Sequence, residues 1–150
     1  MLYAPQLGRG FGLVTIDDVF LGWHREQADR YGLRDHLVGV ASMRTPVAEL
    51  VGAFEDADAG ARVRRAFEEA ARPLVADGAE VLISAGGLFA LLTAREPPLH
   101  VDGAVVLNPL SLTAKLAEVA VTLGLRPCRA STFAAAPARA IDEFRALVRS

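Results

Sequence analysis

The sequence DGAEVLISAGGLFALL, residues 77–92, decides the fold of this chain. β-branched and apolar residues dominate its first half and predict a buried strand over Glu80–Ser84. Gly86 and Gly87 predict a turn, and Leu, Phe and Leu at helical spacing predict a helix that begins near Leu88. A strand, a glycine turn and a helix in this order form a βα unit, from which parallel sheets are built.

The turn between this strand and this helix is a candidate anion site. The first N–H groups of a helix have no partner inside it, and the positive end of the helix dipole lies there as well. Such groups bind small anions, for example a carboxylate, and glycines let a ligand approach the backbone closely. The alternative is a tight turn that serves packing only.

Strands alternate with helices along the chain, which predicts an α/β fold. Apolar runs predict strands over 11–16, 37–43, 80–84 and 104–107. Amphipathic patterns predict helices over 18–31, 47–54, 59–76, 111–123 and 138–148. We expect a three-layer sandwich with a four-stranded parallel sheet in the flavodoxin-like order 2-1-3-4. We expect a single domain over residues 1–150, with a core over 10–124 and a C-terminal extension over 125–150 that carries the last helix.

Two of these helices have a clear expected inner face. In the helix over 59–76 the inner residues are Val63, Ala66, Phe67, Ala70 and Leu74. In the helix over 18–31 they are Val19, Phe20, Trp23, Gln27 and Tyr31. Pro73 conflicts with the longer helix, because proline lacks an N–H group, so we expect a kink in the last turn or an early end. Pro97 and Pro98 are expected to end the helix that begins near Leu88.

Small polar residues stand where the predicted strands end, namely Thr15, Ser42, Ser84 and Asn108. The carboxyl ends of parallel strands meet at one edge of a sheet, where ligands of open α/β folds bind. Four such residues at one edge favour a ligand pocket there. The alternative is that their hydroxyl and amide groups cap helices and turns.

Composition narrows the possible functions. The net charge of −2 gives no reason to expect nucleic acid or an anionic membrane surface as a partner. The single Cys128 excludes an internal disulfide and a cysteine-rich metal site. His24, His36 and His100 lack metal-ligand spacing, so we expect no metal and assign them solvated or capping roles. No apolar run is long enough to span a bilayer and the start does not resemble a signal peptide, so we expect a cytoplasmic protein.

Other reactive residues have ordinary explanations. Asp17 and Asp18 follow the first strand, as in phospho-acceptor receiver domains, but the third strand ends in Ser84-Ala85 and offers no carboxylate, so helix capping is the better interpretation. Arg126 and Arg129 can lower the pKa of the Cys128 thiol, but nothing in the sequence places a base beside it.

Four segments, in this order, resemble the aspartate/glutamate/hydantoin racemase superfamily, and more narrowly the second half of its members. They are FGLVTIDD at 11–18, YGL at 31–33 with LVGV at 37–40, DGAEVLISAGGLFALL at 77–92 and AVVLNPLSLTAKLAE at 104–118. The resemblance covers roughly residues 11–129. It implies two pseudo-symmetric α/β halves with the active site between them and no cofactor.

The resemblance also implies a mechanism with one cysteine from each half. One thiolate removes the proton next to a carboxylate or hydantoin carbonyl, and the other thiol returns a proton to the opposite face. N–H groups at helix starts would stabilise the enolate that develops.

This chain departs from that pattern, because Ala85 stands at the position of the second-half cysteine. We also expect the first half to be missing, so no catalytic residue is assigned. The expected substrate-binding residues are Thr15, Ser84, Ala85, Gly86, Gly87 and Asn108.

The sequence therefore predicts a cofactor-independent racemase-like protein, partial or catalytically impaired, that binds a small carboxylate or cyclic amide. The alternative is a non-enzymatic carboxylate-binding or assembly module. An apolar fraction of 52% is high for a lone domain and favours a partner, either a homodimer or the missing N-terminal half.

Overall fold

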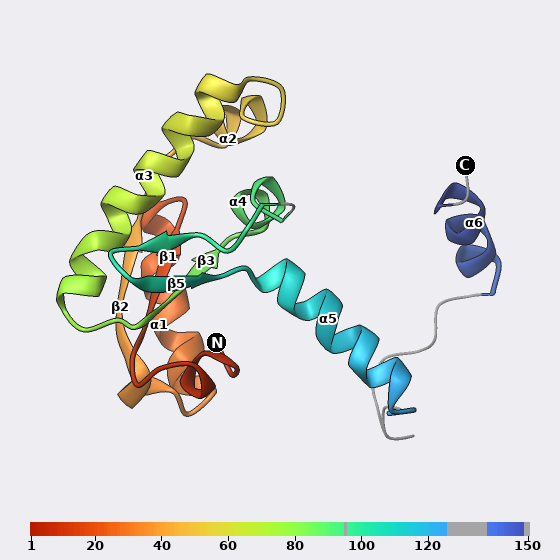
Figure 1. Cartoon of the computed structure of the whole chain (residues 1–150), viewed down its shortest axis with the longest axis horizontal. Coiled ribbons are helices and arrows are strands. Elements are labelled where there is room, and N and C mark those ends of the chain that lie inside the picture. The colour runs from red at the N-terminus through yellow and green to blue at the C-terminus, as the bar shows by residue number, and fades with distance from the viewer. Residues whose placement is uncertain (95, 126–137, 149–150) are drawn as a thin grey trace. The chain divides into compact units, whose positions relative to one another are not determined.

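The computed structural model describes residues 1–94, 96–125 and 138–148. The chain divides into two compact units, Met1–Leu116 and Ala117–Ser150. The first unit contains a mixed sheet with helices and confirms the α/β class (Figure 1). Within the described residues, no helix is long and apolar enough to cross a membrane.

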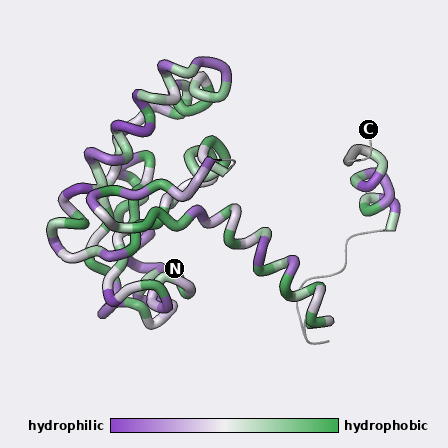
Figure 2. The backbone as a smooth tube through the Cα atoms, in the orientation of Figure 1, coloured by the Kyte–Doolittle hydropathy of each residue, from purple (hydrophilic) through white to green (hydrophobic). Residues whose placement is uncertain are grey.

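The sheet has five strands in the order β2-β1-β3-β5-β4. The four parallel strands are β1 (Phe11–Thr15), β2 (Leu37–Ser42), β3 (Val81–Ala85) and β5 (Ala104–Leu107). Their carboxyl ends share one edge, where β1 lies between β2 and β3, and Thr15 is in register with both Ser42 and Ala85. Apolar residues run through these strands, as Figure 2 shows.

The four predicted strands lie in the predicted order 2-1-3-4, but the prediction of a four-stranded, fully parallel sheet was wrong. An extra edge strand, β4 (His100–Val101), pairs antiparallel with β5. The two strands are joined by Asp102 and Gly103, whose φ angles of 47° and 91° both lie in the left-handed region typical of a tight hairpin turn. A strand of two residues is too short to show a periodic pattern, which is why the sequence did not reveal it.

One face of the sheet is covered by α3 (Ala57–Ala76). Its predicted inner residues Val63, Phe67 and Leu74 are buried, and the Phe67 ring stacks on the Phe89 ring with centroids 4.4 Å apart. Ala66 and Ala70 are partly buried against the same cluster. Pro73 does not end the helix early, because α3 continues to Ala76.

The opposite face is covered by α1 (Leu21–Arg30), which follows the 3₁₀ turn η2 (Asp18–Phe20). The prediction of the inner face of α1 was wrong. Val19, Trp23 and Tyr31 are more than half exposed, whereas His24 and Ala28 are buried. The 3₁₀ turn winds more tightly than an α-helix, so residues before and after it do not share one 3.6-residue face. The face of α1 that packs on the sheet is thus small and contains a histidine.

The remaining elements connect and extend this core. These elements are η1 (Ala4–Gln6), η3 (Arg34–His36), α2 (Val47–Gly52), α4 (Gly87–Leu92), α5 (Pro109–Thr122) and α6 (Ala138–Val148). The helix α4 follows β3, and α5 follows β5. The bounds of α6 match the predicted range. Because α4 ends at Leu92, the prolines at 97 and 98 are not what ends it, which corrects the prediction.

Gly12 controls how closely β1 approaches α3. A Cβ atom at this position would lie 2.9 Å from Leu74 Cδ1 and 3.1 Å from Leu74 Cβ. We therefore expect Gly12→Ala to lower the free energy of unfolding by about 1–3 kcal/mol, measured by urea denaturation.

Gly22→Ala is the matched control for this substitution. A Cβ at Gly22 would meet nothing within 4 Å, and alanine favours the helix, so the control should be neutral or stabilising by up to about 1 kcal/mol. Equal stability of the two variants would show that β1 and α3 can separate without cost.

Candidate functional site

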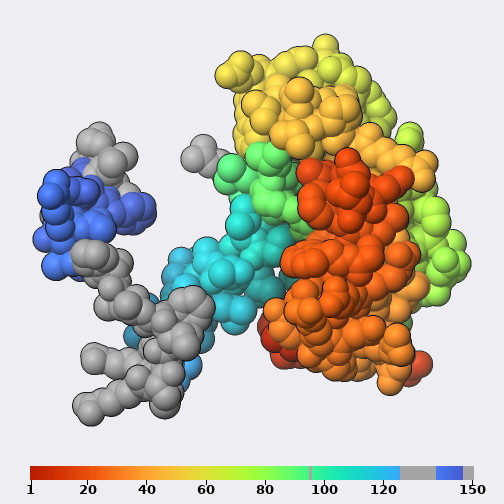
Figure 3. Space-filling view, turned by 180° about the vertical axis from the view of Figure 1, so that it is seen from behind, coloured from red at the N-terminus to blue at the C-terminus, as the bar shows by residue number. Residues whose placement is uncertain are grey.

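A hollow of about 570 Å³ lies on the α1 side of the sheet, at the carboxyl ends of β1 and β3. We call it the α1-side hollow. It is lined by Met1, Leu13, Thr15, Ile16, Phe20, Trp23, His24, Ile83, Ser84, Ala85, Gly86, Gly87, Pro109 and Leu110. Figure 3 views the face on which α1, coloured orange, lies toward the viewer. None of the lining side chains is acidic, and none is lysine or arginine.

Five of the six predicted site residues meet in this hollow, namely Thr15, Ser84, Ala85, Gly86 and Gly87. Thr15 and Ala85 are paired in register and belong to the same face of the sheet as Leu13 and Ile83, because side chains alternate along a strand. The methyl group of Ala85 therefore stands on the wall of the hollow beside Thr15.

Ser84 contributes to the hollow differently. Alternation places its side chain on the opposite face, with Val14 and Leu82, which pack in the α3-side cluster. Its Oγ is buried without a hydrogen-bond partner among the described residues. The hydroxyl of Ser84 is therefore not presented to a ligand in the hollow, and its contribution there comes from the backbone.

The predicted residue Asn108 lies elsewhere. Its Oδ1 accepts hydrogen bonds from the backbone N–H groups of Leu110 and Ser111, at 3.0 and 3.1 Å. Its Nδ2 donates to the carbonyl oxygen of Ala90 at 2.7 Å and to Thr93 Oγ1 at 3.2 Å. Asn108 lines a separate hollow of about 400 Å³, so the structure does not bring it together with Thr15. Its contacts are those of a helix cap that ties α5 to α4.

The glycine turn is open to the hollow. A Cβ at Gly87 would meet nothing within 4 Å, and one at Gly86 would meet only Ile16 Cγ2 at 3.7 Å. Within the described part of the chain, the backbone N–H groups of residues 87–89 have no acceptor. These N–H groups are available to a ligand, but α4 has only six residues, so its dipole is weaker than that of a full-length helix.

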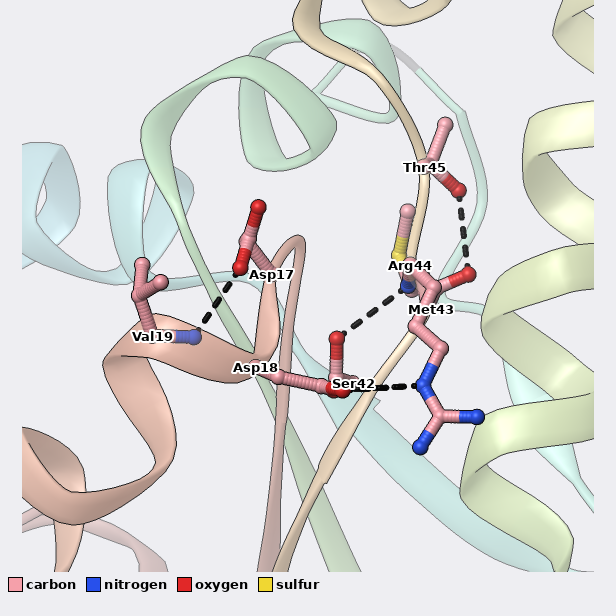
Figure 4. A network of polar contacts seen from close by, with 7 residues as sticks. All are labelled: Asp17, Asp18, Val19, Ser42, Met43, Arg44 and Thr45. Carbon is pink, nitrogen blue, oxygen red and sulfur yellow. Dashed lines mark hydrogen bonds and ion pairs between the residues drawn. The ribbon is translucent and has the colours of Figure 1, made fainter.

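The acidic pair after β1 is used for structure (Figure 4). Asp17 Oδ1 accepts from the Val19 N–H at 2.9 Å and caps η2, which confirms the capping prediction. The carboxylate of Asp18 lies 3.0 Å from Arg44 Nε, and Ser42 Oγ accepts from the Arg44 N–H at 3.1 Å. These groups occupy the neighbouring corner of the sheet edge and do not line the α1-side hollow.

His24 is the residue that the sequence analysis missed. It lines the hollow and is only 8% exposed, so the expectation of a solvated or capping role was wrong. Its Nδ1 is enclosed without a partner among the described residues, and its ring meets the Trp23 ring edge-on with centroids 4.8 Å apart. Burial lowers the pKa of His24 below its ordinary value, so the neutral imidazole is favoured. The i, i+4 spacing of His24 and Ala28 was the available signal.

Two other predictions concern reactive groups. Cys128 lies outside the described residues. In the ranges that the structure describes, no three His, Cys, Asp or Glu side chains are grouped so that they could hold a metal ion.

A sequence model of the Asp/Glu/Hydantoin racemase family matches residues 1–117. The chain belongs to this family. Its structure resembles the allantoin racemase from Klebsiella pneumoniae, with a TM-score of 0.65, 22% identity, and coverage of 91% of this chain and 55% of that chain. It also resembles the allantoin racemase from Pseudomonas fluorescens, with a TM-score of 0.59, 23% identity, and coverage of 91% and 57%. The racemase-family chain thus spans just over half the length of both enzymes. No curated protein sequence matches it.

The lowered pKa of His24 predicts a component of acid sensitivity. The unfolded chain takes up a proton at this histidine at a higher pH than the folded chain does. Stability is therefore lost as pH falls through the ordinary value of 6.5, and the loss stops growing below the folded pKa. His24→Gln should lose less stability between pH 7.5 and pH 5 than the wild type, measured by urea denaturation at several pH values.

His36→Gln is the control for this prediction, because His36 is exposed and its Nδ1 lies 3.1 Å from the Arg9 carbonyl oxygen, away from the hollow. The control should follow the wild-type pH dependence. Parallel pH curves for the wild type and His24→Gln would contradict the assignment.

Proposed function

We propose that this chain is a cofactor-independent member of the racemase family that binds a small carboxylate or cyclic amide in the α1-side hollow. The observation that carries the proposal is the position of Ala85. It ends β3, stands on the wall of the hollow beside Thr15 and is followed by an open glycine turn whose N–H groups have no acceptor among the residues that the structure describes.

The chemistry of racemisation explains why we propose impaired catalysis. A carbon acid must lose a proton from one face and gain one on the other, so two acid/base groups are needed. The methyl group of Ala85 cannot carry a proton, and Thr15 offers only a weakly acidic hydroxyl. His24 in the lining is a single titratable group, whereas racemisation needs two, so on this proposal at least one acid/base group comes from another half or another subunit.

The second candidate is a ligand-binding or assembly module without catalysis. The same alanine favours it, because a hollow with no thiol can bind and release a ligand unchanged. The two candidates differ in whether the wall at residue 85 is placed against the reactive carbon of the ligand.

Ala85→Cys separates these candidates. If the hollow orients a carbon acid against residue 85, a thiolate there should exchange its α-proton with solvent, at a rate at least about tenfold above that of Ala85→Ser. The measurement is deuterium uptake from D₂O into 5-benzylhydantoin and into aspartate, followed by NMR. The wild type should show no exchange above buffer.

Two controls make the result specific. Gly87→Val should abolish the gained exchange, because its side chain would extend into the open turn, whereas Gly52→Val, on α2 with nothing within 4 Å of its Cβ, should not. Saturable ligand binding with no exchange in Ala85→Cys would favour the non-catalytic module. Robust wild-type exchange that survives Cys128→Ser would refute the proposed loss of thiol chemistry.

We also propose that the rim of the hollow contacts a second α/β half, supplied by another copy of this chain. Large apolar side chains that line the hollow are exposed, with exposed fractions of 54% for Trp23, 42% for Phe20 and 41% for Leu110. Val19, next to Phe20 in the chain, is 74% exposed. A contiguous patch of exposed apolar side chains more often marks an interaction surface than a surface that stays in contact with water.

Assembly can be measured directly by light scattering. The wild type should be a homodimer or larger, and the double variant Val19→Lys/Trp23→Lys should shift to monomer, because two charges would have to be buried in the contact. Tyr31→Lys is the control, because Tyr31 is exposed at the C-cap of α1 and lies outside the lining of the hollow. A monomeric wild type at high concentration would contradict the proposal.

A further inference from the structure

His24 packs in the wall of the α1-side hollow. Its side chain comes from α1, the ring contacts the Trp23 ring at an interplanar angle of 67°, and the residue is more than nine-tenths buried. Of its two ring nitrogens, Nδ1 is the one that is fully enclosed without a partner among the described residues. The nitrogen that a molecule in the hollow can reach is therefore Nε2.

The enclosed nitrogen decides which tautomer is favoured. A buried N–H donor without an acceptor is rarer and more costly in proteins than an acceptor with an unused lone pair. Because Nδ1 has no acceptor among the described residues, the ring keeps its proton on Nε2. The hollow is then offered an N–H donor from α1, in a lining that also includes Thr15 of β1.

We propose that His24 is a ligand-binding residue, whose Nε2–H donates a hydrogen bond to a carbonyl or carboxylate oxygen of the molecule in the α1-side hollow. This inference rests on the proposed function only in assuming that the hollow is the ligand site. It assigns to α1 a role in recognition that is separate from the strand ends and from the glycine turn.

The lining also indicates whether a carbonyl oxygen or a carboxylate oxygen is the better acceptor for the His24 N–H group. Leu13, Ile83 and Trp23 make most of the surroundings apolar, and no lining side chain carries a formal charge when His24 is neutral. The cationic group nearest to this lining is the Met1 α-ammonium, and burial lowers its pKa and so weakens it as a partner for a carboxylate. Burying a carboxylate there is therefore unfavourable, whereas a neutral carbonyl needs only the donor. We expect an uncharged cyclic amide to bind more tightly than a dicarboxylate.

Two probes test the assignment on the full chain by calorimetry, 5-benzylhydantoin for the carbonyl and succinate for the carboxylate. His24→Phe keeps a ring against Trp23 but removes both nitrogens, and should weaken binding of the preferred probe by about tenfold. His24→Gln, which can place an amide N–H near the position of Nε2, should recover most of that loss. His100→Phe is the matched control, because His100 is exposed on β4 and outside the hollow, and should bind like the wild type.

A spectroscopic readout separates recognition from a structural role. In ¹⁵N-histidine-labelled protein at neutral pH, long-range ¹H–¹⁵N correlation should show the proton of His24 on Nε2, and addition of the probe should move that resonance. A proton on Nδ1, or wild-type affinity in His24→Phe, would overturn the assignment. If His24→Phe binds normally while Gly87→Val does not, the proposed function stands and this inference fails. If neither probe binds the wild type, both fail.

Discussion

The parallel pairing of β1 with β3 is the constraint on which the site depends. Its register sets Thr15 beside Ala85, and strand alternation turns both toward α1. A slip of β1 by one residue would bring Val14 beside Ala85 at that wall and send Thr15 into the α3-side core. The character of the hollow, a hydroxyl beside a methyl group, is therefore a property of the sheet rather than of any loop.

The two faces of the sheet are filled very differently. On one, α3 inserts a long apolar stripe and approaches β1 closely at Gly12. On the other, α1 buries only His24 and Ala28 among its own residues. So small a contact face leaves space between α1 and the ends of the strands, and the large side chains of Phe20 and Trp23 border that space without closing it. The hollow follows from this asymmetry.

Much of the fold could be predicted because its strands are continuous apolar runs and α3 has a regular stripe. The strand β4 could not be predicted, because two residues are too few to show the alternation of apolar and polar side chains that indicates a strand. The buried face of α1 was predicted from the positions of its apolar residues. This prediction fails because several of those apolar side chains border the hollow and remain exposed. Five predicted site residues meet because the carboxyl ends of the strands converge. Asn108 is not among them, because its side chain caps the first turn of α5. The face to which Ser84 points could be assigned only from the register of β1 and β3. His24 is polar on a mostly polar helix, so only packing reveals it.

Asn108 joins two walls that are distant in sequence. Its amide holds the end of α4 through Ala90 and Thr93, and the start of α5 through Leu110 and Ser111. The same helices begin at Gly87 and Pro109, on the border of the α1-side hollow. One side chain outside the hollow thus links the two helices whose first residues border it.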